Sequence, residues 1–255
     1  MGYHAASDRP ILVTGPGPEV DAAQTWEWDD GWALAQDMGP RARFGCALSE
    51  SHDGSLLLFG GALGVPMRDT WSWDGTTWTQ VDDSGPGARS EAAMATDPVR
   101  KKDILFGGVS GGTDVPVQSE TWTWDGSFWS PIDDSGPALN LPKLAWDTTT
   151  STLVLVGSFG SSSTTSTYIW TQHMWVPVND LGPDVPVGAL LSTPVGVVAV
   201  TSTGTWTWNG TRNRWTQVQD VGPRSTELCG VWHRKENLGI VFDGAAGSTW
   251  RLSHD

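Results

Sequence analysis

The stretch Thr25-Trp26-Glu27-Trp28-Asp29 decides the fold, because close copies of it recur along the chain. Each copy starts with threonine and carries two bulky apolar residues separated by one position. The copies lie at residues 70–74, 121–125, 167–170, 205–209 and 249–252. From the second residue of one copy to that of the next, the spacings are 45, 51, 46, 38 and 44 residues. A repeat of this period indicates a series of similar supersecondary units.

Three further signals accompany the copies. A second tryptophan follows the first five copies, at Trp32, Trp78, Trp129, Trp175 and Trp215. Beyond each of these tryptophans comes a Gly-Pro pair, at residues 39–40, 85–86, 136–137, 182–183 and 222–223. Apolar runs closed by glycine precede several copies, as at residues 56–61, 104–108 and 153–157. Asp-Gly or Asn-Gly between a copy and its second tryptophan is a hairpin signal. Each unit is therefore expected to form four short antiparallel strands, the pattern of a propeller blade.

This combination resembles the kelch repeat family. The matching features are the glycine pairs at 60–61 and 107–108, the paired and single tryptophans, the Asp-Gly turn and the Gly-Pro-x-x-Arg segment. The resemblance covers nearly the whole chain, and several positions recur together. It implies an all-β fold, a six-bladed kelch-type β-propeller with four-stranded antiparallel blades. The unit around residues 158–178 lacks the glycine pair and the Asp-Gly turn, which blurs its boundaries.

We expect one domain, residues 1–255, with blades at about 1–37, 38–83, 84–134, 135–180, 181–220 and 221–255. The first blade would use residues 3–7 and 11–14 as its first two strands. The last blade would end with its third strand at residues 250–253, so we expect it to be incomplete. An unpaired strand at that edge could pair with another chain. The expected state is a monomer or an edge-paired dimer.

Composition excludes several classes of function. The chain has 255 residues, 15 Lys+Arg against 29 Asp+Glu, a formal net charge of −14 and a pI of about 4.5. This acidity argues against binding nucleic acid or an anionic membrane, because both require a positive surface. No signal peptide or membrane-spanning stretch is visible, and two cysteines form no disulfide framework. We therefore expect a cytoplasmic protein.

Most of the 17 tryptophans occupy the repeat positions. The two in each Trp-x-Trp pair point to the same face of their strand, which favours packing between neighbouring blades. Trp146 and Trp232 lie outside these positions, near the end of the first strand of their blades. Trp232 either lines the central channel as a ligand-binding residue or packs within its own blade.

Basic residues gather near the expected channel mouth. Arg43 and Arg89 lie three residues beyond the proline of their Gly-Pro pairs, and Arg41, Lys143 and Arg224 are nearby. These five residues are candidates for binding a locally anionic ligand. A structural role is open for Arg43 and Arg89, because an arginine at this position can also bond loop carbonyls.

Two cysteines suggest a metal site. Cys46 and Cys229 lie six residues beyond their prolines, and matching the first blade to the others places His4 there too, within one residue. Thiolate and imidazole suit zinc, copper or iron. The alternative is a pair of buried, inert thiols, and the separation of neighbouring sheets, about 10 Å, weighs against a shared ion.

Two kinds of function remain open. Kelch propellers include protein-interaction and ligand-binding modules, and also enzymes. We expect a binding platform for a protein or small ligand, at the channel mouth and the face that carries the long loops 15–24, 60–69, 107–120 and 157–166. The alternative is a stand-alone small-molecule enzyme, a lyase, isomerase or cyclase, using the Cys/His cluster as a metal site. A sugar-binding lectin ranks lowest, since these loops contain almost no aromatic residues.

Overall fold

The computed structural model describes residues 1–15, 21–111, 116–160, 162, 164–179, 182–220 and 222–253. The chain divides into two compact units, residues 1–134 and 135–255. This division coincides with the expected boundary between the third and fourth blades, and each unit is described by itself. Within the described ranges, no helix has the length and apolar character needed to cross a membrane.

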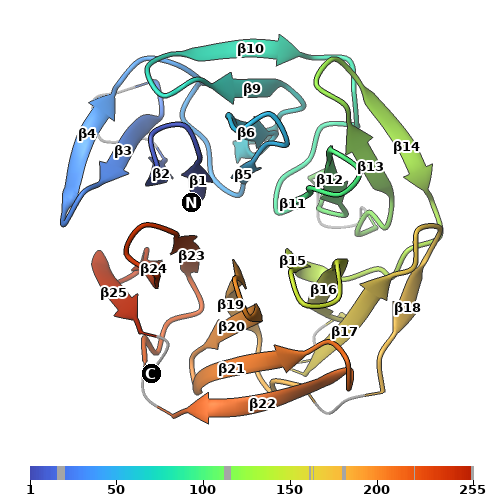
Figure 1. The fold of residues 1–255 in the computed structure, drawn as a ribbon. Helices are drawn as coiled ribbons and strands as arrows, with labels where there is room; N and C mark the ends of the chain where they lie inside the picture. Colours follow the sequence, from blue (N-terminus) through green and yellow to red (C-terminus); the bar gives the residue numbers. More distant parts are fainter. Residues whose placement is uncertain are drawn as a thin grey trace. The chain divides into compact units, whose positions relative to one another are not determined.

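The first unit contains three four-stranded antiparallel sheets. Their first strands, β1, β5 and β11, contact one another in that order, and β4, β10 and β14 form the opposite edges of the sheets (Figure 1). The strands are β1 (Gly2–His4), β2 (Arg9–Thr14), β3 (Gln24–Trp28) and β4 (Trp32–Gln36); β5 (Ala47–Glu50), β6 (Leu56–Phe59), β9 (Thr70–Trp73) and β10 (Trp78–Asp82); and β11 (Ala93–Asp97), β12 (Lys102–Phe106), β13 (Thr121–Trp124) and β14 (Trp129–Asp133).

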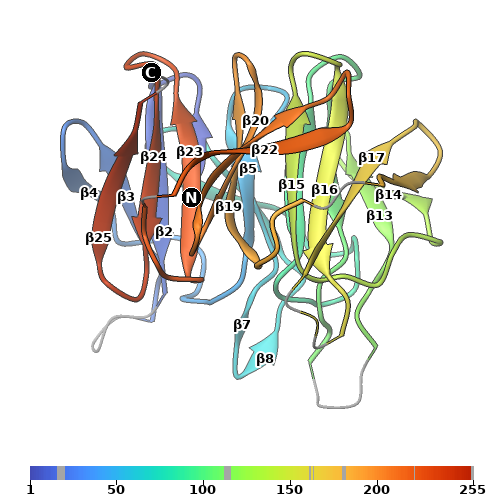
Figure 2. The ribbon, with the colours of Figure 1, turned by 90° about the horizontal axis from the view of Figure 1, so that it is seen from below.

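A small hairpin that the sequence did not predict extends from the second sheet. It consists of β7 (Ala62–Leu63) and β8 (Val65–Pro66), with Gly64 at its turn. Figure 2 shows this hairpin beyond the end of the sheet. Gly64 has a φ of +78°, a conformation that side chains with a Cβ rarely adopt. The hairpin therefore gives part of the expected loop 60–69 a defined shape.

The second unit contains two four-stranded sheets and one three-stranded sheet. Here β15, β19 and β23 are the contacting first strands. The strands are β15 (Asn140–Asp147), β16 (Thr152–Ser158), β17 (Thr165–Trp170) and β18 (Trp175–Pro177); β19 (Val187–Thr193), β20 (Gly196–Thr201), β21 (Gly204–Asn209) and β22 (Arg214–Gln219); and β23 (Leu228–His233), β24 (Leu238–Asp243) and β25 (Ser248–Leu252). The sheets are blades 1 to 6 of an all-β propeller, as predicted, and blade 6 has three strands.

Tryptophans fill the space between neighbouring blades. In blade 2, Trp73 and Trp78 have ring centroids 5.4 Å apart. Both pack in one apolar cluster with Ile11 from blade 1 and with Leu56 and Leu58 from their own blade. Burying a side chain of this size contributes on the order of 2–3 kcal/mol. The prediction that the repeated tryptophans pack between blades is confirmed.

Hydrogen bonds join three of the fourth-strand tryptophans to the preceding blade. The indole Nε1 of Trp78 donates to the Oγ1 of Thr25 at 2.8 Å. Equivalent bonds run from Trp129 to Thr70 at 2.9 Å and from Trp215 to Thr167 at 2.9 Å. Thr25, Thr70 and Thr167 are thus buried acceptors for the tryptophan at the start of the next blade's fourth strand.

Candidate functional site

Arg43 is buried and holds two loops of blade 2 together. Its Nε donates to the carbonyl of Arg41 at 2.8 Å, and its Nη1 donates to the carbonyl of Gly60 at 3.0 Å. The guanidinium also forms a bidentate ion pair with Asp69, at 2.6 and 2.8 Å. Burial opposes ionisation of Asp69, but its hydrogen bonds with Arg43 and Trp71 outweigh this, so the pKa of Asp69 is lowered. Arg43 therefore has a structural role.

Arg89 repeats the same arrangement in blade 3. It donates to the carbonyls of Gly87 at 2.9 Å and Gly107 at 3.1 Å, and pairs with Glu120 at 2.9 Å. A hydrogen bond from Trp122 and the contact with Arg89 lower the pKa of Glu120. The bonds to loop carbonyls, which the sequence allowed as one explanation of these arginines, are present in both blades.

The other candidate ligand residues belong to different units of the chain. Arg41 is exposed in the first unit, just before Ala42. In the second unit, Arg224 is exposed in the segment before β23, and Lys143 is half-buried in β15. Trp232 is buried in β23 and lines a cavity, described below. A ligand-binding role for Arg41, Lys143 and Arg224 stays a prediction. Parts of the long loops, residues 16–20, 112–115, 161 and 163, lie outside the described residues.

His4 and Cys46 stand at opposite ends of their strands. His4 ends β1, where its Nδ1 accepts a hydrogen bond from the backbone N–H of Ser7 at 3.3 Å and lies 2.7 Å from the Ser7 hydroxyl. Cys46 comes directly before β5 and packs against the apolar cluster around Trp73. Aligning blades 1 and 2 through their strand pairs places His4 level with Ser51, which is 51 − 46 = 5 residues beyond Cys46. Five residues of strand span about 16 Å.

The expected alignment of His4 with Cys46 is therefore wrong. The first strand of blade 1 begins before His4, and the residues that follow form a turn rather than a strand. Cys229 lies in β23 of the second unit, paired with Phe242. In the ranges that the structure describes, no three or more His, Cys, Asp and Glu side chains are grouped so that they could hold a metal ion.

A zinc, copper or iron site at His4, Cys46 and Cys229 stays a prediction from the sequence. It is tested by elemental mass spectrometry of protein purified without chelator, beside Cys46→Ser. Stoichiometric metal that disappears in the variant would support the site, and equal metal contents would count against it.

The structure brings together one polar cluster that sequence spacing did not reveal. The buried carboxylate of Asp103 in β12 accepts hydrogen bonds from the Ser51 hydroxyl at 2.7 Å and the Thr96 hydroxyl at 2.8 Å. It also lies 2.9 Å from both the backbone nitrogen and the Nδ1 of His52. Ser51 and His52 both contact the aspartate rather than each other. The cluster therefore lacks the serine–histidine contact of a catalytic triad and instead fastens blade 2 to blade 3.

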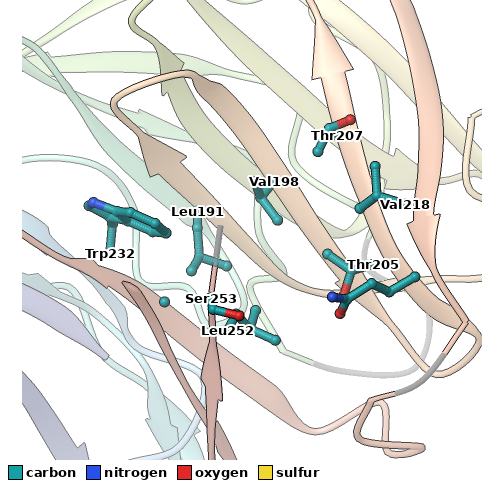
Figure 3. A pocket seen from close by; sticks show the side chains of 10 residues that line it. Leu191, Val198, Thr205, Thr207, Val218, Trp232, Leu252 and Ser253 are labelled. Carbon is teal, nitrogen blue, oxygen red and sulfur yellow. The ribbon is translucent and has the colours of Figure 1, made fainter. Parts of the chain in front are cut away.

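A cavity of about 150 Å³ lies between blades 5 and 6, within the second unit. Figure 3 shows side chains from both blades around this space. Its walls are mainly apolar, and they include Leu191, Val198, Thr205, Trp232, Gly239 and Leu252. An apolar cavity of about 150 Å³ is large enough to hold a benzene ring.

The cavity exists because blade 6 departs from the repeat. The pair Gly239–Leu252 in blade 6 holds the register positions that Leu56–Trp73 holds in blade 2. Glycine replaces leucine, and leucine replaces tryptophan, so both wall residues are smaller. No fourth strand pairs with β25 among the described residues, so this blade also has no counterpart of Trp78 there.

Thr205 carries the unusual polar atom of the cavity. Its residue is 6% exposed, and its Oγ1 is buried with no hydrogen-bond partner in the described part of the chain. Buried hydroxyl groups are nearly always hydrogen-bonded. Leaving one unsatisfied costs about 1–3 kcal/mol. An apolar cavity with one orphaned hydroxyl has the composition of a ligand site, in which few polar groups orient a mainly apolar ligand.

Comparisons with known proteins show the fold. No family model and no curated protein matches the sequence. The structure of YjhT matches with a TM-score of 0.70 and 12% identity, over 96% of this chain and 93% of YjhT. A fungal alcohol oxidase of the AA5 family, in complex with copper, matches with a TM-score of 0.53 and 13% identity, over 95% of this chain and 62% of the oxidase. A protein of unknown function from Dyadobacter fermentans matches with a TM-score of 0.55 and 12% identity, over 92% of this chain and 84% of that protein. At such identities the likeness shows the fold alone.

Proposed function

We propose that this protein is a kelch-type propeller that acts as a binding module, and that the cavity between blades 5 and 6 receives an aromatic group of its ligand. The main support for the proposal is the Thr205 hydroxyl, which has no hydrogen-bond partner among the described residues and lies in the wall of a mainly apolar cavity. The wall residues Leu191, Thr205 and Trp232 are buried, so a ligand would find a preformed site. A ring with one N–H donor matches both the apolar wall and the hydroxyl.

The simplest probe is 5-fluoroindole, observed by fluorine NMR. Saturable broadening or a shift of the probe signal on adding protein is the expected result. Leu252→Trp restores the residue that other blades have at this position and fills the cavity, so binding should be lost. Thr216→Val is the matched control, because Thr216 is an exposed threonine on β22 and its loss should leave binding unchanged.

Two results would overturn the proposal. One is the absence of saturable binding by folded wild-type protein. The other is unchanged binding by a folded Leu252→Trp variant, which would place the probe elsewhere. The far-ultraviolet spectrum and the unfolding transition of each variant establish that it is folded.

A further inference from the structure

The cavity between blades 5 and 6 is the slot that a fourth-strand tryptophan fills elsewhere in the molecule. In blades 1 and 2, Trp78 donates to Thr25 of the preceding blade and packs on Trp73 of its own. Strand register makes Thr205 the counterpart of Thr25, and Leu252 the counterpart of Trp73. Both counterparts line the cavity. The slot therefore retains its acceptor and its wall.

A second wall residue supports this correspondence. Ile11 packs in the cluster that holds Trp78, and the strand register makes Val198 its counterpart in blade 5. Val198 also lines the cavity. Thr205, Val198 and Leu252 thus hold the positions of the three residues that contact Trp78 between blades 1 and 2.

We propose that blade 6 is completed by a tryptophan-led β-strand from a partner protein. The incoming segment pairs with the open edge of β25, and its indole enters the cavity and donates Nε1–H to the Oγ1 of Thr205. This inference rests on the proposed function, and it narrows the ligand of that site from an aromatic group to an extended polypeptide. Strand addition to a sheet edge is a common mode of peptide recognition.

The edge of blade 6 explains why a strand fits better than a free aromatic molecule. The outer strand of a sheet presents backbone N–H and C=O groups that another strand can pair with. In blade 2, Trp78 lies opposite Trp73 and Gln80 lies opposite Trp71. The same register would place the incoming tryptophan opposite Leu252 and its third residue opposite Trp250. Trp250 is 39% exposed and would gain cover from the added strand.

The partner's sequence is constrained by the chain's own fourth strands. Trp78-Thr79-Gln80-Val81 and Trp215-Thr216-Gln217-Val218 both start with tryptophan and carry valine three residues later. A partner segment of the pattern Trp-x-x-Val therefore fits the edge. Phenylalanine could occupy the cavity but would leave the Thr205 hydroxyl unpaired, so tryptophan is preferred.

The test uses a synthetic peptide with the sequence of residues 76–82, acetylated, amidated and labelled with fluorescein. Its affinity for the full chain is measured by fluorescence polarisation. The peptide and the protein are both acidic, so nonspecific charge attraction does not assist binding. We expect it to bind at least tenfold more tightly than N-acetyltryptophanamide. Replacing its tryptophan by alanine should abolish binding.

A double replacement isolates the hydrogen bond. In the peptide, 3-benzothienylalanine replaces tryptophan and exchanges the indole N–H for sulfur with little change in shape. In the protein, Thr205→Val removes the acceptor. Each change alone should weaken binding about fivefold to tenfold, as expected for one hydrogen bond. The two changes together should reduce the affinity no more than either one alone. Additive losses of affinity would show that the indole N–H and the Thr205 hydroxyl do not bond to each other.

Hydrogen exchange locates the strand. Peptide binding should slow exchange of the backbone amides of residues 248–252, and N-acetyltryptophanamide should not. If indole compounds bind in the cavity but the peptide binds no better and protects no amide, the strand proposal is wrong and the proposed function stands. If neither binds, both are wrong.

Discussion

At the scale of single residues, two arginines organise the chain around its glycine pairs. Gly60 and Gly61 have φ values of +60° and +97°, and a Cβ on Gly60 would lie 2.5 Å from the carbonyl oxygen of Arg89. The tight turn brings the Gly60 carbonyl to Arg43. The same guanidinium also pairs with Asp69, so one side chain satisfies the carbonyl of a tight glycine turn and a half-buried carboxylate.

Arg43→Ala should therefore destabilise the fold strongly. Truncation leaves Asp69 with the Trp71 hydrogen bond but without its ion-pair partner, and leaves the Gly60 carbonyl without the Arg43 donor. We expect a loss of about 3–5 kcal/mol in the free energy of unfolding, as for breaking other buried ion pairs. Urea denaturation measures it. Arg41→Ala is the control, since an exposed side chain two residues away should change the value by less than about 0.5 kcal/mol. Equal losses in the Arg43→Ala and Arg41→Ala variants would show that the Arg43–Asp69 ion pair contributes little to the free energy of unfolding.

His4 gives the stability of the protein a pH dependence. Burial lowers the pKa of His4 below 6.5, although Glu27 and Asp74 oppose the shift. The unfolded chain therefore binds a proton more readily than the folded one, and stability is lost as pH falls below about 6.5 toward the folded pKa. Protonation at Nδ1 would also remove the acceptor for Ser7. His4→Asn keeps an acceptor but cannot titrate.

The expected result is a wild-type unfolding free energy that falls more steeply than that of His4→Asn between pH 7 and pH 5. Urea denaturation at several pH values provides both profiles. If the two unfolding free energies fall in parallel, groups other than His4 cause the loss of stability at low pH.

At the scale of elements, the sequence defined the blades well because turns and tryptophans mark each strand. The first blade is the exception. Strand β1 was expected at residues 3–7 but covers Gly2–His4, because the turn that follows contains no glycine to mark it. Asp8 adopts a φ of +55° there instead. This shift moved His4 to the other end of the strand, and the expected alignment with Cys46 failed with it.

The cavity could be predicted only in part. The printed sequence shows that no second tryptophan follows the copy at residues 249–252. The size of the space is not visible there, because it depends on which side chains face each other across blades 5 and 6. The repeat already placed Leu252 at a tryptophan position, but only the register shows that Gly239 lies opposite it in place of Leu56.

Thr70 and Thr205 provide a matched pair for the contact between neighbouring blades. Thr70→Val removes the acceptor for Trp129 and leaves a buried indole N–H without a partner. We expect a loss of about 1–3 kcal/mol. Thr205→Val removes a buried hydroxyl that has no hydrogen-bond partner among the described residues, so the free energy of unfolding should be unchanged or increased. Urea denaturation of both variants measures the change in the free energy of unfolding. Similar losses in both variants would contradict the difference between the site that Trp129 fills and the cavity at Thr205.

At the scale of the whole molecule, the charge of −14 opposes folding through self-repulsion. Salt screens this repulsion at distances beyond about 10 Å. Raising NaCl from about 10 mM to about 150 mM at a pH above 7 should stabilise the protein by about 1 kcal/mol, or about 2–4 °C in Tm. Differential scanning calorimetry measures the shift. A fall in Tm would mean that attractive pairs such as Arg43–Asp69 outweigh the net repulsion.

The paired indoles also have an optical consequence. In blades 1 to 5, the last tryptophan of the third strand lies 4.9–5.5 Å from the first of the fourth, centroid to centroid. Electronic transitions of two chromophores this close couple, and each pair adds bands of opposite sign to the circular dichroism spectrum. Strand content fitted from that spectrum would be in error. The amplitude of these paired bands would instead report whether blades 1 to 5 are folded. Blade 6 would contribute no such bands, because Leu252 stands at the tryptophan position and is not a chromophore.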